Sequence, residues 1–167
     1  MIASLTGILT SIGKSEIIIE VNGVGYLLNV TSKLISTLGE IGSTLSVLTD
    51  LQIKDDKILV YGFTTVADQD FFRLLQTVQG IGPKAALSIL SALTINELIL
   101  AISSGDKAMI SRADGVGPKV AARVASELSE KVANMQLICG KKILIINIKK
   151  TILIPQNIIS PMRKSSF

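Results

Sequence analysis

The chain of 167 residues contains no histidine and a single cysteine, Cys139. One cysteine can form neither a disulfide framework nor a cysteine-based metal cluster. Apart from the neighbouring pair Asp55 and Asp56, no acidic cluster completes an evident metal site. These absences argue against a metal-dependent nuclease, and we expect no cofactor, no metal and no catalytic residue in this chain.

A leader and a long apolar run are also missing. The segment from Met1 to Leu5 lacks a basic stretch followed by an unbroken apolar run, so the sequence predicts no secretory signal. Lys149 and Lys150 interrupt the isoleucine-rich C-terminal segment, and no uninterrupted apolar run reaches 18 residues. We therefore expect no membrane span and a cytoplasmic location.

Acidic residues are absent from residues 139–167, which carry six bases. Residues 1–63 carry four bases and six acids, and residues 64–138 carry seven of each. Without the last segment the net charge of +4 becomes −2. Overall charge therefore does not predict nucleic-acid binding, and any such affinity must come from locally placed charges.

The most informative pattern is a repeat. Residues 78–84 and 113–119 share Gly, an aliphatic residue, Gly, Pro and Lys in the same order, with a period of 35 residues. Such a period indicates a duplicated supersecondary unit. Because proline suits the first position of a helix, each copy predicts a helix, a tight hairpin and a second helix.

The chemistry of this repeat favours anion binding. Glycine permits backbone angles and close approaches that a Cβ would prevent. The amides of the hairpin and of the following helix N-terminus would then face outward, where the helix dipole favours an anion. A lysine in the first turn adds a positive charge. We expect phosphate contacts from residues of both copies: Gly80, Gly82, Lys84, Gly115, Gly117, Lys119 and Arg123.

Residues 1–63 predict a small β domain. A short mixed run covers Ile2 to Leu9, and further strands are predicted at 16–21, 26–30, 45–53 and 57–63, with a glycine-rich hairpin at 22–25. A short helix around 32–38 is compatible with the pattern. Five short strands favour an OB-fold-like barrel, although another small β domain would also fit.

From residue 64 the periodicity becomes helical, and residues 64–138 predict an all-α domain containing both hairpins. Thr65 with Asp68, and Thr94 with Glu97, have the spacing of helix capping boxes. Phe71 and Phe72 are expected in the core. Asp55 and Asp56 occupy the tip of the last β-hairpin, where aspartates usually serve as solvated turn formers.

The order of these parts strongly resembles the RuvA family, whose members bind Holliday junctions in the bacterial branch-migration complex. The resemblance extends from residue 1 to about 138 and includes the glycine-rich turn at 22–26, the Tyr-Gly-Phe junction at 61–63 and both hairpins. It implies a homotetramer, or an octamer, that holds an open four-way junction. It also implies that Asp55 and Asp56 form an acidic pin at the centre.

The resemblance further implies RuvB as an ATP-driven partner and RuvC as a resolvase, with no covalent chemistry by this chain. The family continues into a helical third domain that engages RuvB, and residues 139–167 do not resemble it. We interpret this isoleucine- and lysine-rich segment as a degenerate or out-of-frame ending that packs poorly, which places RuvB coupling in doubt.

We thus expect a junction-specific DNA scaffold. Two alternatives remain at this point. One is a helix-hairpin-helix repair enzyme of the glycosylase type, which would need a catalytic Asp or Lys in a base-flipping pocket. The other is a duplex-binding module without junction preference.

Overall fold

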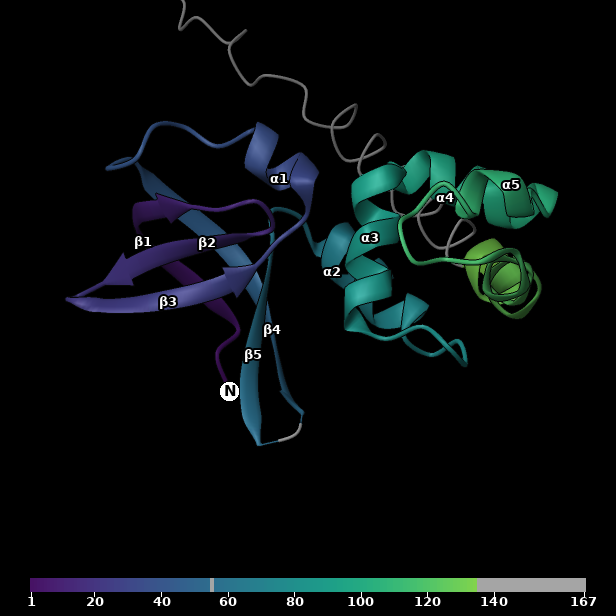
Figure 1. The fold of residues 1–167 in the computed structure, drawn as a ribbon, viewed down its shortest axis with the longest axis horizontal. Helices are drawn as coiled ribbons and strands as arrows, with labels where there is room; N and C mark the ends of the chain where they lie inside the picture. The colour runs from purple at the N-terminus through teal and green to yellow at the C-terminus, as the bar shows by residue number, and fades with distance from the viewer. Residues whose placement is uncertain (55, 135–167) are drawn as a thin grey trace, which may run out of the picture. The chain divides into compact units, whose positions relative to one another are not determined.

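The computed structural model describes residues 1–54 and 56–134, so the segment 139–167 lies outside the described residues. Residues 1–132 form one unit, in which a β-barrel is followed by helices (Figure 1). The separate domain boundaries expected at residues 63 and 138 stay predictions.

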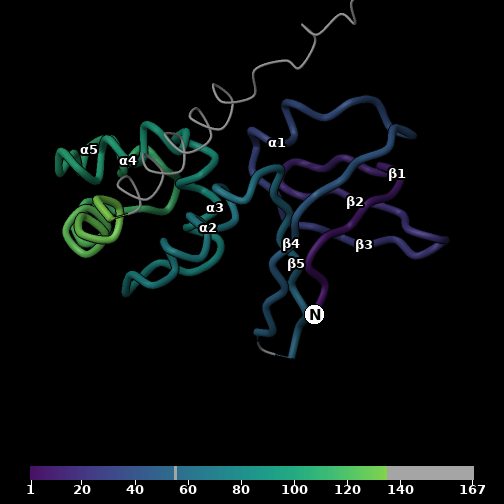
Figure 2. The backbone as a smooth tube through the Cα atoms, turned by 180° about the vertical axis from the view of Figure 1, so that it is seen from behind, coloured from purple at the N-terminus to yellow at the C-terminus, as the bar shows by residue number. Residues whose placement is uncertain are grey.

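The barrel contains five strands in the closed order β1-β2-β3-β5-β4. The strands are β1 (Ser4–Ile12), β2 (Glu16–Val21), β3 (Val24–Asn29), β4 (Thr44–Lys54) and β5 (Lys57–Phe63), and α1 (Ser32–Ser36) lies between β3 and β4. All neighbours are antiparallel except β3 and β5, which pair in parallel at Asn29 and Tyr61. The predicted barrel is confirmed, and the hairpin of β4 and β5 extends beyond the rest of it (Figure 2).

Alternating side chains fill the barrel. Leu9, Ile17, Ile19 and Leu28 are fully buried in its core, as the period of two in a strand requires. The predicted turn between β2 and β3 has positive φ at Asn22 (50°) and Gly23 (81°). Positive φ at both positions is the requirement of a two-residue type I′ turn, which suits the twist of a β-hairpin.

The helical part contains α2 (Val66–Leu75), α3 (Pro83–Ala92), α4 (Ile95–Ser104), α5 (Lys107–Ile110) and a helix over residues 118–134. The predicted capping box at α4 is present, because Thr94 Oγ1 accepts from the Glu97 amide at 3.3 Å and the Glu97 carboxylate accepts from the Thr94 amide at 2.7 Å. These two bonds satisfy donors that a helix start leaves unpaired. Gly105 ends α4 in the left-handed region, with φ 69°.

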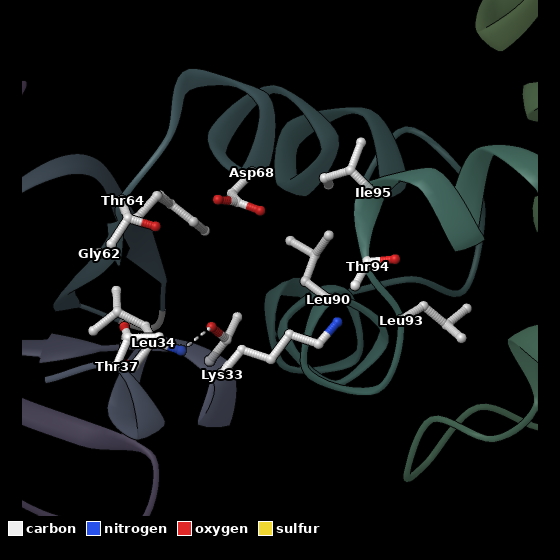
Figure 3. Close-up of a pocket in the computed structure, with 12 residues that line it drawn as sticks. Lys33, Leu34, Thr37, Gly62, Thr64, Asp68, Leu90, Leu93, Thr94 and Ile95 are labelled. Carbon is white, nitrogen blue, oxygen red and sulfur yellow. Dashed lines mark hydrogen bonds between the residues drawn. The ribbon is translucent and has the colours of Figure 1, made fainter.

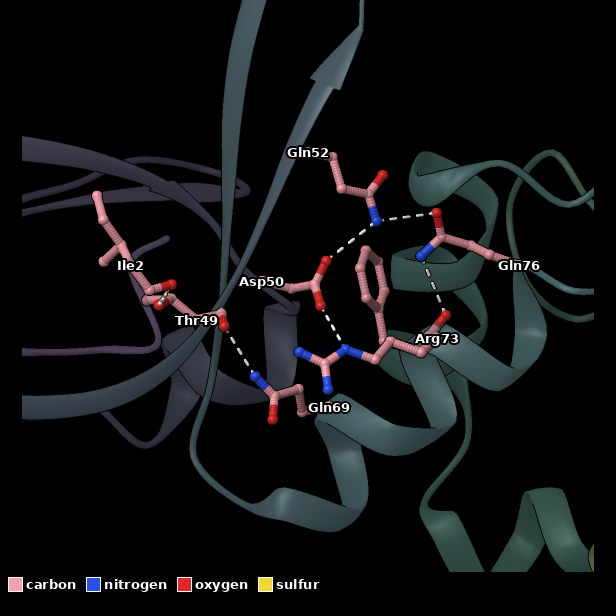
Figure 4. Close-up of polar contacts among 8 residues, drawn as sticks. Ile2, Thr49, Asp50, Gln52, Gln69, Arg73 and Gln76 are labelled. Atoms are coloured by element: carbon pink, nitrogen blue, oxygen red, sulfur yellow. Dashed lines mark hydrogen bonds and ion pairs between the residues drawn. The ribbon is translucent and has the colours of Figure 1, made fainter.

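A polar network joins β4 to α2 (Figure 4). Asp50, which is 9% exposed, forms an ion pair with Arg73 Nε at 2.5 Å, and Gln52 Nε2 donates to Asp50 at 3.2 Å and to Gln76 at 3.1 Å. Gln69 Nε2 donates to the Thr49 carbonyl at 2.8 Å. The barrel and the first helix of the helical part are therefore held together by several specific bonds.

Aromatic packing supports the same junction. The ring of Phe72, which is fully buried, lies 4.9 Å from the ring centroids of both Tyr61 and Phe63 at the end of β5. Phe71 is also buried, so the expected core role of the phenylalanine pair is confirmed. The junction between β5 and α2 is therefore packed as a core, and this fixes the side of the barrel on which the helices lie.

Within the described part of the chain, no single helix is long and apolar enough to cross a membrane. Only α3 and α4 taken together reach that length and composition, and they are bent by 101°.

Candidate nucleic-acid interface

The first hairpin connects α2 to α3. The Ile81 amide donates to the Val78 carbonyl at 3.1 Å, and both side chains are buried. Gly80 between them has φ 96°, and the Ala86 amide donates to the Gly82 carbonyl at 2.9 Å as α3 begins. The aliphatic residue thus anchors the turn inward.

The second hairpin repeats this geometry. The Val116 amide donates to the Ala113 carbonyl at 3.1 Å, and the Ala121 amide donates to the Gly117 carbonyl at 2.9 Å. Val116 and Ala113 are buried, and Gly115 has φ 78°. The two copies of the sequence repeat therefore have the same backbone structure, which confirms the predicted pair of helix-hairpin-helix motifs.

The glycines in each hairpin have two different roles. Gly80 and Gly115 have positive φ, which an L side chain rarely adopts. Gly82 has φ −92°, and a Cβ at Gly82 or at Gly117 would meet no atom within 4 Å. The fold therefore requires glycine at the first position of each pair but not at the second. The empty space beside the second glycine allows an external group to approach the backbone.

The start of α3 offers unpaired donors. The first amides of a helix have no intrahelical acceptor. Pro83 has no N–H, and in the described structure no side chain caps this helix at Gly82. The amides of Lys84 and Ala85 are thus open to an anion at the positive end of the helix. Lys84 and its counterpart Lys119 are exposed.

Reciprocal hydrogen bonds fix the two motifs against each other. Arg123 donates from one guanidinium nitrogen to the Gln79 carbonyl at 3.3 Å and to Gln79 Oε1 at 3.0 Å. Ser88 Oγ donates to the Asp114 carbonyl at 2.8 Å. Ser88 and Arg123 are one repeat period apart, and so are Gln79 and Asp114. Each motif therefore donates to the hairpin of the other from an equivalent position.

This arrangement assigns a structural contact to Arg123, which the sequence nominated only as a phosphate ligand. A phosphate contact from its remaining donors stays a prediction. Sequence reasoning missed Gln79 and Ser88, although the 35-residue period could have located them as the counterparts, in the first copy, of Asp114 and Arg123 in the second. Lys131 adds a further contact to the first hairpin, because its Nζ donates to Thr77 Oγ1 at 3.1 Å.

The acidic tip lies at the turn between β4 and β5. Lys54 and Lys57 pair across the hairpin, so the turn consists of residues 55 and 56. Asp56 is exposed with φ 60°, a conformation that aspartate tolerates better than most residues. Asp55 lies outside the described residues, and the pin role of the pair stays a prediction.

A small cavity of about 200 Å³ lies where α1 and the end of β5 meet the helices (Figure 3). Lys33 lines it, and among the described residues its Nζ has no hydrogen-bond partner although the atom is buried. Burial lowers the pKa of Lys33, while Glu97 and Asp68 act in the opposite direction. The Lys33 ammonium is therefore partly desolvated, and the attraction of the two carboxylates offsets part of the cost.

No group of three or more metal-ligating side chains gathers anywhere in residues 1–54 or 56–134.

Comparisons with known proteins agree with both halves of this structure. A family model of the RuvA N-terminal domain matches residues 1–62, and a model of a SAM-like helix-hairpin-helix tandem matches residues 72–130. A protein of Zymomonas mobilis subsp. mobilis, named Holliday junction branch migration complex subunit RuvA, is 46% identical over 142 residues, which cover 85% of this chain and 67% of that protein. The chain belongs to the RuvA family.

Other RuvA relatives carry the same name. The protein of Sphingopyxis alaskensis is 44% identical over 140 residues, which cover 84% of this chain and 70% of the relative. That of Erythrobacter litoralis is 46% identical over 112 residues, which cover 67% of this chain and 56% of the relative. The chain thus spans between about half and seven-tenths of these RuvA proteins.

Proposed function

We propose that this chain binds four-way DNA junctions as the non-catalytic DNA-binding subunit of a branch-migration complex. The observation that carries the proposal is the pair of matched hairpins, each with an exposed lysine and a glycine that the fold itself does not require. The name shared by the relatives, which describes a Holliday junction branch migration complex subunit, supports it.

Backbone binding is the mode that these hairpins favour. Amides and lysines contact phosphate oxygens, which position a protein on DNA without reading its sequence. The reciprocal bonds from Arg123 and Ser88 hold the two hairpins in one geometry. One rigid unit could then contact two phosphate positions on the same arm, which suits a protein that must act on any sequence.

Junction preference would come from the acidic tips. In a four-fold tetramer, Asp55 and Asp56 of each subunit would meet where the strands cross over. Their charges would repel the phosphates there, so each strand would turn into a neighbouring arm. The hairpins would supply the compensating attraction, and this division of roles favours an open junction over a linear duplex.

The partners follow from the family. We infer that RuvB supplies the ATP-driven motor and RuvC cleaves the junction, while this chain holds the DNA. A tetramer is the expected assembly, with an octamer as the alternative. Such a DNA partner agrees with the cytoplasmic location expected from the sequence.

A gel-shift comparison of a synthetic four-way junction with a linear duplex, at the same salt concentration, tests the proposal. We expect tighter binding of the junction and no strand cleavage. Equal affinity for the two DNAs would favour a general duplex-binding module. Bond cleavage by the purified protein would favour a repair enzyme of the glycosylase type.

A further inference from the structure

A groove of about 700 Å³ lies between the barrel and α3. Clefts of this size are typical of ligand-binding sites. The barrel contributes the turn between β1 and β2, and the helical part contributes one face of α3. The polar residues on its two sides include Lys14, Ser15, Tyr61, Lys84, Ser88 and Ser91.

The groove is continuous with the first hairpin. Lys84, in the first turn of α3, lines it, and Asp114 of the second hairpin lies at the same site. Hydrogen bonds define its walls, because Ser91 Oγ accepts from the Ser32 amide at 3.1 Å and Ser88 Oγ donates to the Asp114 carbonyl. An anion bound by the first hairpin would therefore have this groove beside it.

Charge in the groove favours an anion. Two of its lining residues are bases, Lys14 and Lys84, and both are exposed. Among the described residues that line it, Asp114 is the one acid. Lys14 belongs to the barrel and Lys84 to the helical part, so two separate elements of the fold contribute a lysine to the lining of the same cleft.

We propose that the groove binds the sugar-phosphate backbone of the DNA arm held by the first hairpin, with Lys14 as an additional phosphate contact. The inference rests on the proposed function and adds a barrel residue to it. Only the first hairpin has this support, because Lys119 of the second hairpin does not line the groove. The two hairpins are thus alike in backbone but different in surroundings.

The first test is Lys14→Gln in the full chain, with Lys14→Arg as the conservative variant. Loss of one phosphate contact should lower the slope of log affinity against log salt by about 0.9 per bound protomer on duplex arms. The ratio of the unmodified chain's affinity to that of the Gln variant should therefore fall about 3.5-fold as the salt concentration rises from 50 to 200 mM. The Arg variant should bind like the unmodified chain.

Lys107→Gln is the matched control, because Lys107 is exposed on α5 and does not line the groove. An equal loss of affinity for the Lys14 and Lys107 variants would show that only net charge matters and would overturn the proposal. An unchanged salt slope for Lys14→Gln would overturn it as well. Thermal unfolding checks that each variant keeps its fold.

A cross-linking test locates the contact directly. Cys139→Ser removes the single native thiol, and Lys14→Cys or Lys107→Cys then carries a photoactivatable phenyl azide. We expect cross-links to a junction arm from position 14 and not from position 107. Junction-specific binding without cross-links from position 14 would refute DNA binding in the groove and would leave the proposed function intact. If the chain binds linear and four-way DNA with equal affinity and position 14 cross-links to both, junction specificity is refuted while DNA binding in the groove is supported.

Discussion

Replacing the second glycine of each hairpin by serine should separate folding from DNA binding. Gly82 is the N-cap of α3, with φ −92° and ψ 176°, and a Cβ there or at Gly117 would meet no atom within 4 Å. Serine fits these angles and is a preferred N-cap residue. Its hydroxyl would accept from the first-turn amides, Lys84 or Ala85, which are the donors assigned to phosphate.

The two effects should have opposite signs. A serine N-cap is more favourable than glycine by a few tenths of a kcal/mol, so the variant carrying both substitutions should gain roughly 0.5 kcal/mol and about 1–2 °C in Tm. A hydrogen bond to a charged group contributes about 1.5–3 kcal/mol. Losing one such bond at one hairpin should therefore weaken DNA binding by about 10- to 150-fold.

The assay pairs thermal unfolding, followed by circular dichroism, with gel-shift titration of a four-way junction at fixed salt. Thr94→Gly is the control, because it removes the side-chain cap of α4 outside both hairpins. We expect this control to lose a few tenths to about 1 kcal/mol of stability while keeping its DNA affinity. The control would then show that DNA affinity does not depend on the stability of the fold over this range.

Unchanged junction affinity in a more stable Gly82→Ser, Gly117→Ser variant would refute the phosphate role of the hairpin amides. A large loss of stability would instead refute the conclusion that the fold tolerates a side chain at these two positions.

Three further changes test the charged groups. Lys84→Glu with Lys119→Glu should weaken junction binding and make its salt dependence shallower in titrations from 50 to 200 mM salt, whereas unchanged affinity would argue against both lysines. Asp55→Asn with Asp56→Asn should raise affinity for linear duplex and reduce junction preference, and a drop in duplex binding would identify a plain turn. Lys33→Met should raise the free energy of unfolding at pH 7, by at most about 1–3 kcal/mol, because it removes an ammonium whose Nζ is buried without a hydrogen-bond partner among the described residues. Burial lowers the pKa of Lys33 in the folded chain, so the unmodified chain should gain stability relative to this variant as pH rises from the folded pKa toward 10.5. Denaturant unfolding at pH 7 and pH 10 measures the difference, and an equal difference at both values would contradict it.

The local elements could be predicted because their signals are local. Turn residues at 22–23, the capping residues of α4 and the β-rich run of β2 each specify a structure within a few positions. The first strand was predicted at Ile2 to Leu9 but is observed as β1, Ser4–Ile12. Its first half pairs with β4 and its second half with β2, with an irregularity between Leu9 and Ser11. Polar residues interrupt the apolar pattern in that second half, so this part of the strand can be recognised only from its pairing with β2.

Contacts between distant segments could not be predicted in the same way. The ion pair of Asp50 with Arg73 joins two elements whose separate patterns are complete without it. The bonds from Arg123 to Gln79 could not be predicted either, because a surface arginine after a phosphate-binding hairpin is equally compatible with a DNA contact. In both cases the deciding information is the packing of one element on another, which neither hydrophobic period nor capping pattern contains.

The sequence repeat also hides a difference between its two copies. Shared Gly, Gly, Pro and Lys predict equivalent hairpins, and the backbones agree with that prediction. The barrel, however, lies beside α3, so Lys84 and Lys14 line one groove that Lys119 does not line. Duplication thus accounts for the geometry of each hairpin. The ion-paired packing of β4 against α2 places the barrel beside the first hairpin, which thereby gains a second basic residue nearby. The contacts of β4 with α2, the first helix of the first motif, therefore give the two copies unequal surroundings.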